Sequence, residues 1–386
     1  MFRVFATALV VSLAASAAGG PLAPSPAAPP ITAASINDAA PKGANDKDPS
    51  LIAKAEVLLD RAHFSPGAVD GLDGDNFRSA VRAFQETNSL AVTGNLDAGT
   101  WNALASNDTA AVLKAYTISD ADVSGPFTKV IPTNLEEMAK LPGLSYTSPL
   151  AELAEKFHMA QSLLRRLNPL ADFDRAGTKI LVADVPEMNL RPGRHTVEVV
   201  QPKNDMARIA ATIVVDKPAR NVRAYDREDR LLGYYPATMG SEEKPAPSGV
   251  FKVRGVTWNS EYHYDPKFAW KEVKTKQKLT VGPGPNNPVG LVWIDLTAPS
   301  YGIHGTPQPE EIGKTESHGC IRLTNWDAVD LAAMVRPGTV AKFEDLDSPV
   351  PPPPVSVSQG RRPEARRQPP GSDAGAATKS LLSGPR

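Results

Sequence analysis

The stretch from residue 302 to residue 323 constrains the fold of this 386-residue chain more than any other. It carries His304 within Gly-Ile-His-Gly-Thr and, after a spacer, Cys320 within Ser-His-Gly-Cys-Ile-Arg. Cys320 is the only cysteine of the chain, and a thiol becomes a useful nucleophile when a nearby base, usually a histidine, removes its proton. The separation in sequence lets the two residues lie on different strands. The pattern therefore predicts a fold in which His304 faces Cys320.

Residues 1–20 have the features of a secretory signal. Arg3 precedes an apolar run at residues 4–14, and Ala15-Ser16-Ala17 is a small-residue cleavage site. The apolar run is shorter than the ~20 residues that a membrane-spanning helix needs. We therefore expect an exported protein with no integral membrane span after cleavage.

Export sharpens the question of what the single cysteine does. Exported proteins usually carry cysteines as disulfide pairs, and a lone thiol is exposed to oxidants unless it is buried. A buried, inert cysteine is one alternative, but the flanking His-Gly turn favours a reactive one. A zinc site of His304, His318 and Cys320, with His263 as a fourth ligand, is another, but the spacing matches no common zinc pattern. We expect no metal and no cofactor.

The N-terminal half divides into four segments. Residues 21–49 are rich in Ala and Pro and predict a flexible, disordered linker. Residues 50–105 contain apolar residues at helical spacing, interrupted by glycines, which predicts a small three-helix domain. Residues 106–145 are expected to form a connector, and residues 146–187 to form two short helices and a returning strand. A domain as small as the first needs its aromatic side chains in the core, and these are Phe77, Phe84 and Trp101.

The C-terminal half is predicted to be mainly β. Residues 208–345 contain several short apolar runs bounded by turn residues, and Thr324 or Asn325 is expected to cap one helix. The long segment at residues 258–287 is expected to form a wall or lid over the site, because long ordered loops are often functional. Residues 348–386 are Pro-rich and basic, and predict a disordered tail.

The chemistry predicted from these residues is attack on a carbonyl carbon by the Cys320 thiolate. His304 would take the thiol proton and later protonate the leaving amine, with a thioester as intermediate. Gly305 has no side chain, so a backbone carbonyl is expected to orient His304. A second amine or water would resolve the thioester.

The residues around the thiol are predicted to position the substrate. Gly319 permits a tight turn, so the backbone amides near Gly319 and Cys320 can point at the developing oxyanion. Ser317 and His318 are expected to orient the loop or the substrate. Arg322 is expected to pair with a substrate carboxylate or, as an alternative of equal weight, to form a structural ion pair.

At these residues the chain resembles the L,D-transpeptidase family with its YkuD-type catalytic domain. Two upstream turns, Pro245-Ala-Pro-Ser-Gly249 and Gly284-Pro-Asn-Asn-Pro-Val-Gly290, resemble the family as well. The resemblance implies a multidomain protein whose catalytic domain, at residues 208–345, is a mainly-β sandwich. It also implies that Cys320 is the nucleophile and His304 the base, with His318, Gly319 and Arg322 lining the site. Some members carry asparagine in place of Arg322, which leaves the fine substrate preference open.

Two further segments resemble modules that bind the cell wall. Pro66-Gly-Ala-Val-Asp-Gly71, Ala83-Phe-Gln85 and Val92-Thr-Gly-Asn-Leu96 are similar to motifs of the three-helix peptidoglycan-binding domain. Residues 146–187 resemble a degenerate lysin motif, and the alternative is a helical spacer that packs on the catalytic domain. Both resemblances imply a location in the periplasm or cell wall and a role in building the wall and maintaining cell shape.

The resemblances imply an exported cysteine L,D-transpeptidase. It would cleave peptidoglycan stem tetrapeptides after the third residue and transfer the acyl group to an amine of a neighbouring stem or of a wall-anchored protein. Two alternatives remain: an L,D-carboxypeptidase or endopeptidase that uses water, and a non-catalytic protein that binds peptidoglycan glycan. The formal net charge of −1 gives no reason to expect nucleic acid as a partner.

Overall fold

The computed structural model describes residues 31–43, 46–203, 205–268 and 275–345. The expected signal at residues 1–20 and the expected tail at residues 348–386 lie outside the described residues. No helix within the described ranges is long and apolar enough to cross a membrane. The mainly-β catalytic domain and the helical N-terminal region are both confirmed.

The N-terminal region begins with a helix that the sequence did not predict. Residues 33–37, within the expected disordered linker at residues 21–49, form α1. The linker prediction is therefore wrong for this part of the segment. Thr32 and Ser35 form a reciprocal capping box that satisfies backbone groups at the helix start. Ile36 is fully buried in the core, which supplies the packing that so short a helix needs.

Three longer helices follow where a three-helix domain was predicted: α2 (Pro49–Arg61), α3 (Asp75–Thr87) and α4 (Ala98–Asn107). Asp48 and Asp97 cap α2 and α4 by accepting hydrogen bonds from backbone N–H groups in the first turn. Phe77 and Phe84 are buried as predicted, whereas Trp101 is only partly buried against the same core.

The segment expected to be a simple connector contains a strand. β1 (Leu113–Thr117) pairs antiparallel with β2 (Lys179–Ala183), which closes a two-stranded sheet around four intervening helices. These helices are α5 (Asp120–Ser124), α6 (Leu135–Met138), α7 (Pro149–Lys156) and α8 (Gln161–Leu167). A second small sheet follows, formed by β3 (Leu190–Pro192) and β4 (Val197–Val199).

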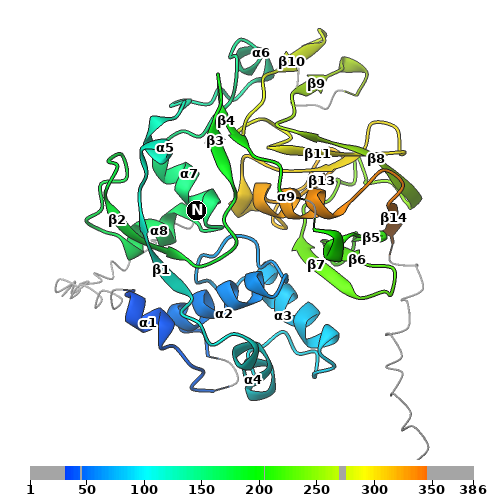
Figure 1. The fold of residues 1–386 in the computed structure, drawn as a ribbon. Helices are drawn as coiled ribbons and strands as arrows, with labels where there is room; N and C mark the ends of the chain where they lie inside the picture. Colours follow the sequence, from blue (N-terminus) through cyan, green and yellow to red (C-terminus); the bar gives the residue numbers. More distant parts are fainter. Residues whose placement is uncertain (1–30, 44–45, 204, 269–274, 346–386) are drawn as a thin grey trace, which may run out of the picture. The chain divides into compact units, whose positions relative to one another are not determined.

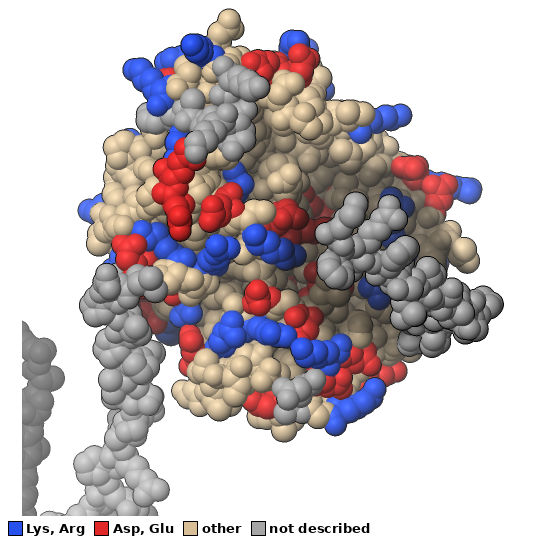
Figure 2. All heavy atoms as spheres, turned by 180° about the vertical axis from the view of Figure 1, so that it is seen from behind, with Lys and Arg blue, Asp and Glu red and all other residues tan. Residues whose placement is uncertain are grey.

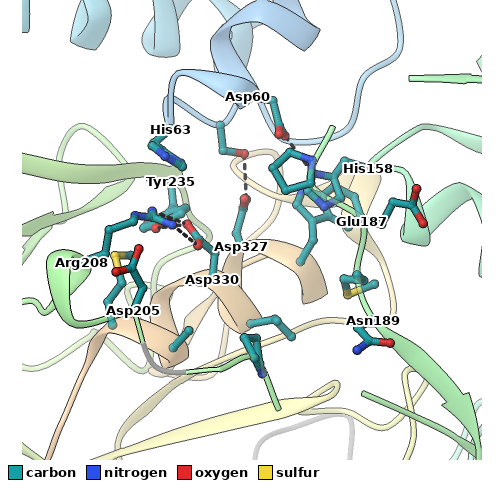
Figure 3. A pocket seen from close by; sticks show the side chains of 18 of the residues that line it. Asp60, His63, His158, Glu187, Asn189, Asp205, Arg208, Tyr235, Asp327 and Asp330 are labelled. Carbon is teal, nitrogen blue, oxygen red and sulfur yellow. Dashed lines mark hydrogen bonds and ion pairs between the residues drawn. The ribbon is translucent and has the colours of Figure 1, made fainter. Parts of the chain in front are cut away.

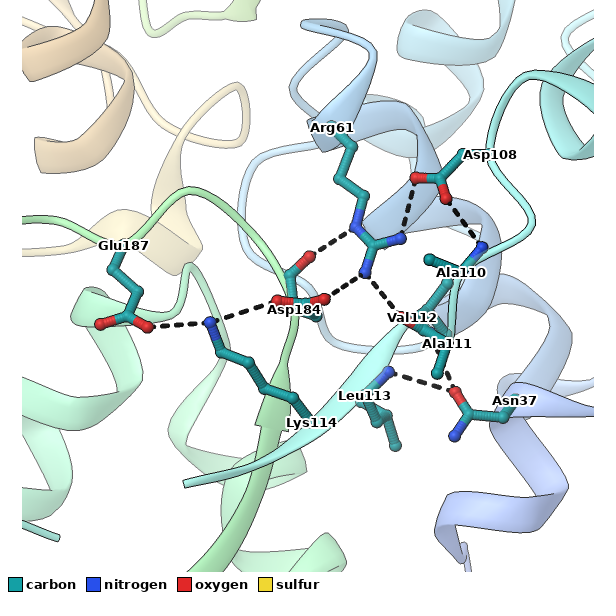
Figure 4. Close-up of polar contacts among 10 residues, drawn as sticks. All are labelled: Asn37, Arg61, Asp108, Ala110, Ala111, Val112, Leu113, Lys114, Asp184 and Glu187. Carbon is teal, nitrogen blue, oxygen red and sulfur yellow. Dashed lines mark hydrogen bonds and ion pairs between the residues drawn. The ribbon is translucent and has the colours of Figure 1, made fainter. Parts of the chain in front are cut away.

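The helices of the first hundred residues and the β1–β2 unit share one hydrophobic core. This core includes buried side chains from α1 to α4, from β1 and β2, and from α7 and α8, together with Tyr234 of the catalytic sheet. Arg61 at the end of α2 reinforces the contact, since it bonds to Asp108 at 2.8 Å and to Asp184 at 2.9 Å (Figure 4). The same guanidinium reaches the carbonyl oxygen of Ala111 at 2.7 Å.

The catalytic region is built on a curled, mixed sheet of eight strands in the order β13-β12-β11-β8-β14-β5-β6-β7 (Figure 1). The pairs β12–β13 and β14–β5 are parallel, and the other neighbours are antiparallel. The bounds are β5 (Thr212–Asp216), β6 (Asn221–Tyr225), β7 (Leu231–Pro236), β8 (Gly249–Trp258), β11 (Val292–Leu296), β12 (Gly302–His304), β13 (Ile321–Arg322) and β14 (Val340–Glu344).

One helix packs against this sheet, and a small hairpin projects from it. The helix is α9 (Asn325–Met334), and of the two expected cap residues, Thr324 and Asn325, it is Thr324 that caps it. The long segment expected to form a wall or lid contains the hairpin of β9 (Tyr262–Tyr264) and β10 (Leu279–Val281). Three short 3-10 helices complete the described structure, at Met206–Arg208, Pro266–Phe268 and Pro309–Glu311.

The N-terminal region extends the edge of the catalytic sheet. Phe64 forms a parallel bridge with Tyr234 of β7, because the backbone N–H of Tyr234 donates to the carbonyl of His63 and the N–H of Ser65 donates to the carbonyl of Tyr234. Both bonds are 2.9 Å long. The Ser65 hydroxyl also bonds to the buried carboxylate of Asp327 in α9 at 3.0 Å. Backbone and side-chain bonds thus join the two regions.

Candidate active site

The parallel pair β12–β13 brings the predicted residues together. Ile303 is opposite Ile321, and His304 is opposite Arg322. Side chains alternate between the two faces of a strand, so Cys320, two residues before Arg322, shares its face. Ile303 and Ile321 point into the core on the other face, where both are fully buried. His304, Arg322 and Cys320 therefore lie on one face, away from the core.

The loop that carries the thiol is held by its own serine. The Ser317 hydroxyl bonds to the carbonyl oxygen of Cys320 at 2.5 Å and accepts a bond from the Gly319 N–H at 3.1 Å. The Ser317 backbone also bonds to Met239 and Ser241 on the neighbouring segment. Gly319 has φ +110°, a conformation that other residues rarely adopt. The predicted tight turn is present, and Ser317 orients the loop.

His304 is a buried, oriented imidazole. Its Nδ1 lies 2.7 Å from the carbonyl oxygen of Gly305, which only accepts hydrogen bonds, so Nδ1 carries the proton and Nε2 is an acceptor. The ring stacks on the indole of Trp293 in β11, with centroids 5.5 Å apart. Gly302 makes room for that indole, since a Cβ there would lie 2.5 Å from it. A backbone carbonyl thus orients His304, as the sequence suggested.

Burial is the largest influence on the pKa values of both His304 and Cys320. Burial first, and then the charge of Arg322, lower the pKa of His304 to about 3. Burial raises the pKa of the Cys320 thiol, although the Gly302 backbone N–H and the charge of Arg322 act in the opposite direction. At neutral pH the resting site therefore holds a neutral imidazole and a neutral thiol. The thiol hydrogen bond in this structure goes to the Ser300 carbonyl, at 3.8 Å.

The β9–β10 hairpin contributes a residue that the sequence did not identify. Burial raises the pKa of the Tyr262 hydroxyl. The negative charge of an ionised Cys320 raises it further, because the two groups lie near each other. Burial lowers the pKa of the Arg322 guanidinium, and the negative charges of ionised Cys320 and Tyr262 act on it in the upward direction. Tyr262 thus belongs to the site. The Tyr-His-Tyr sequence of β9 is typical of a strand, but the sequence does not show that Tyr262 lies near Cys320.

The predicted site residues separate into two groups. Gly305 and Ser317 are buried at the site, and His318 is exposed between Ser317 and Cys320 on the loop that carries the thiol. His263 lies on β9, where its imidazole is 3.2 Å from the Thr280 hydroxyl. Over the described part of the chain, no group of three or more His, Cys, Asp and Glu side chains is arranged to hold a metal ion.

A second cavity lies between the helical region and α9 (Figure 3). It has a volume of about 280 Å³, and its polar groups bond mostly to one another. His158 bonds to Asp60 at 2.9 Å, and Arg208 bonds to Asp330 at 3.0 Å. Burial and the charge of Asp60 raise the pKa of Asp327. The cavity lacks the thiol, so we place the candidate chemistry at the β12–β13 face.

The comparisons with known proteins identify two regions of the chain. The profile of the L,D-transpeptidase catalytic domain matches residues 210–357. A profile described as "Putative peptidoglycan binding domain" matches residues 49–104. The resemblance of residues 146–187 to a lysin motif stays a prediction.

Three relatives from Bacillus share the name "Putative L,D-transpeptidase". YkuD of Bacillus licheniformis is 34% identical over 33% of this chain and 61% of its own length. YkuD of Bacillus subtilis is 49% identical over 29% of this chain and 52% of its own length. This chain therefore spans only about half to three fifths of those two relatives. YqjB of Bacillus subtilis is 31% identical over 34% of this chain and 70% of its own length. By sequence and by the arrangement of its site, the chain belongs to the L,D-transpeptidase family.

Proposed function

We propose that this protein is a cysteine L,D-transpeptidase that acts on peptidoglycan stem tetrapeptides. The observation that carries the proposal is the parallel register of β12 and β13, which puts His304, Arg322 and Cys320 on one face. Cys320 is partly exposed, so a substrate can reach the sulfur from outside. The family matches support the same reaction class.

The first half of the reaction forms a thioester. Nε2 of His304 takes the proton from the Cys320 thiol, and the sulfur attacks the carbonyl carbon of the third stem residue. The tetrahedral intermediate collapses as the carbon–nitrogen bond breaks, and His304 gives its proton to the departing D-alanine amine. The neutral thiol and neutral imidazole of the resting site hold one transferable proton between them, which this step requires.

The second half of the reaction resolves the thioester. The amine of a neighbouring stem, or of a wall-anchored protein, attacks the same carbonyl carbon and loses a proton to His304. The carbon–sulfur bond breaks, and the sulfur takes the proton back from His304. We propose that the backbone N–H of Cys320 donates to the oxyanion in both halves, since the Gly319 N–H is bonded to the Ser317 hydroxyl. Such a donor typically contributes about 10²–10³ in rate.

Arg322 is proposed to hold a carboxylate of the stem peptide. Its guanidinium is partly buried beside the thiol, and the groups that affect its pKa, after burial, are Cys320 and Tyr262. Among the described residues no carboxylate forms an ion pair with Arg322, which favours a substrate partner over a structural one. Charge-assisted bonds from arginine to carboxylate are among the strongest hydrogen bonds available.

Charges of both signs are mixed on one face of the molecule. Figure 2 shows Lys and Arg side chains lying beside Asp and Glu side chains on the face opposite to that of Figure 1. Ion pairs in the described chain include Arg254 with Asp295 and Lys114 with Glu187. On this face, specificity for a peptide substrate is therefore expected to come from the site itself, not from a broad field of one sign.

Residues 49–104 are proposed to hold the enzyme on the wall, which would raise the local concentration of substrate. The family match supports this role. The test uses residues 31–200, which contain nearly all of the shared N-terminal core, in a pelleting experiment with insoluble peptidoglycan. No enrichment over a control protein of similar charge would reduce the segment to a spacer. A wall-bound enzyme would act in the periplasm or cell wall.

The experiment that tests the reaction is digestion of a defined muropeptide mixture, with products identified by mass. Release of D-alanine with formation of a cross-linked dimer supports transpeptidation. Release of D-alanine with tripeptide alone would identify the carboxypeptidase alternative, in which water is the acceptor. Binding of muropeptides without release of D-alanine would contradict the proposal and would identify the chain as a wall-binding protein.

A further inference from the structure

One fully buried amide lies against the backbone next to His304: that of Asn325, the first residue of α9. Its side-chain oxygen accepts a hydrogen bond from the Leu291 N–H at 3.0 Å. Its side-chain nitrogen donates to the Pro285 carbonyl at 3.3 Å and to the Glu155 carboxylate at 2.9 Å. Both donors and one lone pair are therefore occupied, which fixes the orientation of the amide.

Asn325 in turn fixes the backbone beside the reacting histidine. A Cβ at Gly305 would lie 2.2 Å from the Asn325 side-chain oxygen, and a Cβ at Gly290 would lie 2.1 Å from it. The two glycines let the backbone lie directly against this amide. The Gly305 carbonyl is the group that orients His304, at 2.7 Å from Nδ1. A displaced Asn325 would therefore move the partner of the imidazole.

Glu155 reaches this amide from outside the region that matches the catalytic family. It lies on α7, and one carboxylate oxygen accepts both the Asn325 amide and the Tyr146 hydroxyl, the latter at 3.2 Å. Burial raises the pKa of Glu155 to about 7, against the opposing effect of these two hydrogen bonds. A buried carboxylate is costly compared with an apolar side chain of the same size. The presence of Glu155 is therefore better explained by its orienting the Asn325 amide than by a contribution to the stability of the fold.

We propose that Glu155 is a positioning residue for the reaction: it holds Asn325, which holds the Gly305 carbonyl, which orients His304. The inference rests on the proposed function, because it assigns the 146–187 segment a part in the same reaction. The segment thereby supplies one polar side chain that completes the site from behind. His304 and Cys320 remain the groups that touch the substrate.

The test compares steady-state kinetics of the full chain and its variants on a stem tetrapeptide with an amine acceptor. Glu155→Ala should lower kcat at least tenfold and change KM less than twofold, because the substrate does not contact Glu155. Glu155→Gln should stay within threefold of the wild type, since its amide oxygen still accepts from Asn325 and Tyr146. Tyr146→Phe, which removes only the hydroxyl that holds Glu155, should lower kcat two- to fivefold.

Glu152 provides the matched control. It lies on the same helix and is as buried as Glu155, yet one of its carboxylate oxygens has no hydrogen-bond partner among the described residues. Glu152→Ala should leave kcat unchanged, which separates positioning from a general effect on α7. Thermal unfolding of each variant shows whether it folds. If Glu155→Ala does not fold, the kcat values of Glu155→Gln and Tyr146→Phe still test the proposal.

A double-mutant cycle and a spectroscopic signal complete the test. If Glu155 acts through Asn325, Glu155→Ala combined with Asn325→Ala should be no slower than Asn325→Ala alone. The Nδ1 proton and nitrogen resonances of His304 should shift in Glu155→Ala and stay in Glu152→Ala, with His158 as an internal reference.

Two results would overturn the proposal: a kcat within twofold of the wild type in folded Glu155→Ala, or effects of Glu155→Ala and Asn325→Ala that multiply. An inactive wild type would instead count against the proposed function. In that case the shift of the His304 resonances in Glu155→Ala would still test whether Glu155 orients His304.

Discussion

Two histidines of this protein have nearly the same surroundings and different partners. His304 and His158 are both buried, and each stacks on a tryptophan, with centroids 5.5 Å apart at Trp293 and 5.3 Å apart at Trp326. The Nδ1 of His304 bonds to a backbone carbonyl, and the Nδ1 of His158 bonds to the carboxylate of Asp60. Burial against an aromatic ring therefore does not by itself mark a catalytic histidine.

The partner of each ring explains the difference in role. Burial and the charge of Arg322 keep His304 neutral, and the carbonyl fixes its proton on Nδ1, so Nε2 can accept a proton. The ring of His158 instead joins two regions, because Asp60 lies on α2 and Trp326 on α9. The carbonyl of His158 also accepts the Val69 N–H at 2.8 Å, which adds a backbone bond to the same junction.

The largest expected effect comes from removing the nucleophile. Cys320→Ala should abolish turnover, because no other thiol exists in the chain to replace it. The unfolding temperature should stay unchanged. Release of D-alanine from stem tetrapeptides measures turnover, and intact mass with a carbapenem measures acylation. One adduct in the wild type and none in Cys320→Ala is expected. Residual turnover of a tenth of the wild-type rate would place the chemistry elsewhere, with the cavity of Figure 3 as the next candidate.

The two histidines should respond to alanine in opposite ways. His304→Ala should lower kcat by about 10²–10⁴, the usual contribution of a general base, with a small effect on stability. His158→Ala should leave kcat within a few-fold and lower the free energy of unfolding by roughly 1–3 kcal/mol, as for loss of a buried hydrogen-bonded side chain. Urea unfolding and kcat on the same preparations give the comparison. A reversed pattern would exchange the two roles.

The pH dependence of thiol labelling tests whether the resting pair is neutral. Because burial raises the pKa of Cys320, the thiolate fraction should rise about tenfold per pH unit through neutral pH. His304, with a pKa of about 3, stays neutral above that value and adds no step between pH 5 and 8. The iodoacetamide rate should therefore climb without a shoulder. A flat, fast rate from pH 5 upward would reveal a thiolate–imidazolium pair.

The smallest expected effect is at the loop. Ser317→Ala removes the hydroxyl that bonds to the Cys320 carbonyl and the Gly319 N–H, and these bonds are worth about 1 kcal/mol each. We expect kcat to fall about tenfold, with retained acylation by a carbapenem. His318→Ala, on the exposed part of the same loop, should change KM more than kcat. Equal losses of kcat in both variants would argue that the loop acts as one unit.

The sequence singled out the proposed nucleophile and base because these residue types are chemically distinctive. His304 and Cys320 were found from residue type, and their spacing indicated that they belong to different strands; in the structure His304 ends β12 and Cys320 directly precedes β13. The carbonyl partner of His304 was predicted from the absence of a side chain at Gly305. Most of the strands and the cap of α9 at Thr324 were also readable, because periodicity and capping are local properties.

The residues that the sequence missed act over long distances in the chain. Tyr262, Trp293 and Glu155 reach the site from three different elements, and no local pattern states which residues those elements face. β1 was missed for the same reason, since its partner β2 follows more than sixty residues later. The short helix α1 was missed because composition suggested a linker, whereas tertiary packing of Ile36 decides its structure.

The position of β14 gives this enzyme an order of assembly. It lies between β8 and β5 in the middle of the sheet, although it is the last strand of the described chain. It supplies the ladder between β8 and β5, whereas the segment after β7 reaches the other end of the sheet through backbone bonds of Thr238 with Arg322 and of Ser241 with Ser317. Its parallel pairing joins Val340 to Thr212, a closure of long sequence separation that is slow to form. A nascent chain that has not yet released residue 344 therefore carries Cys320, the proposed nucleophile, on a sheet that lacks one of its central strands.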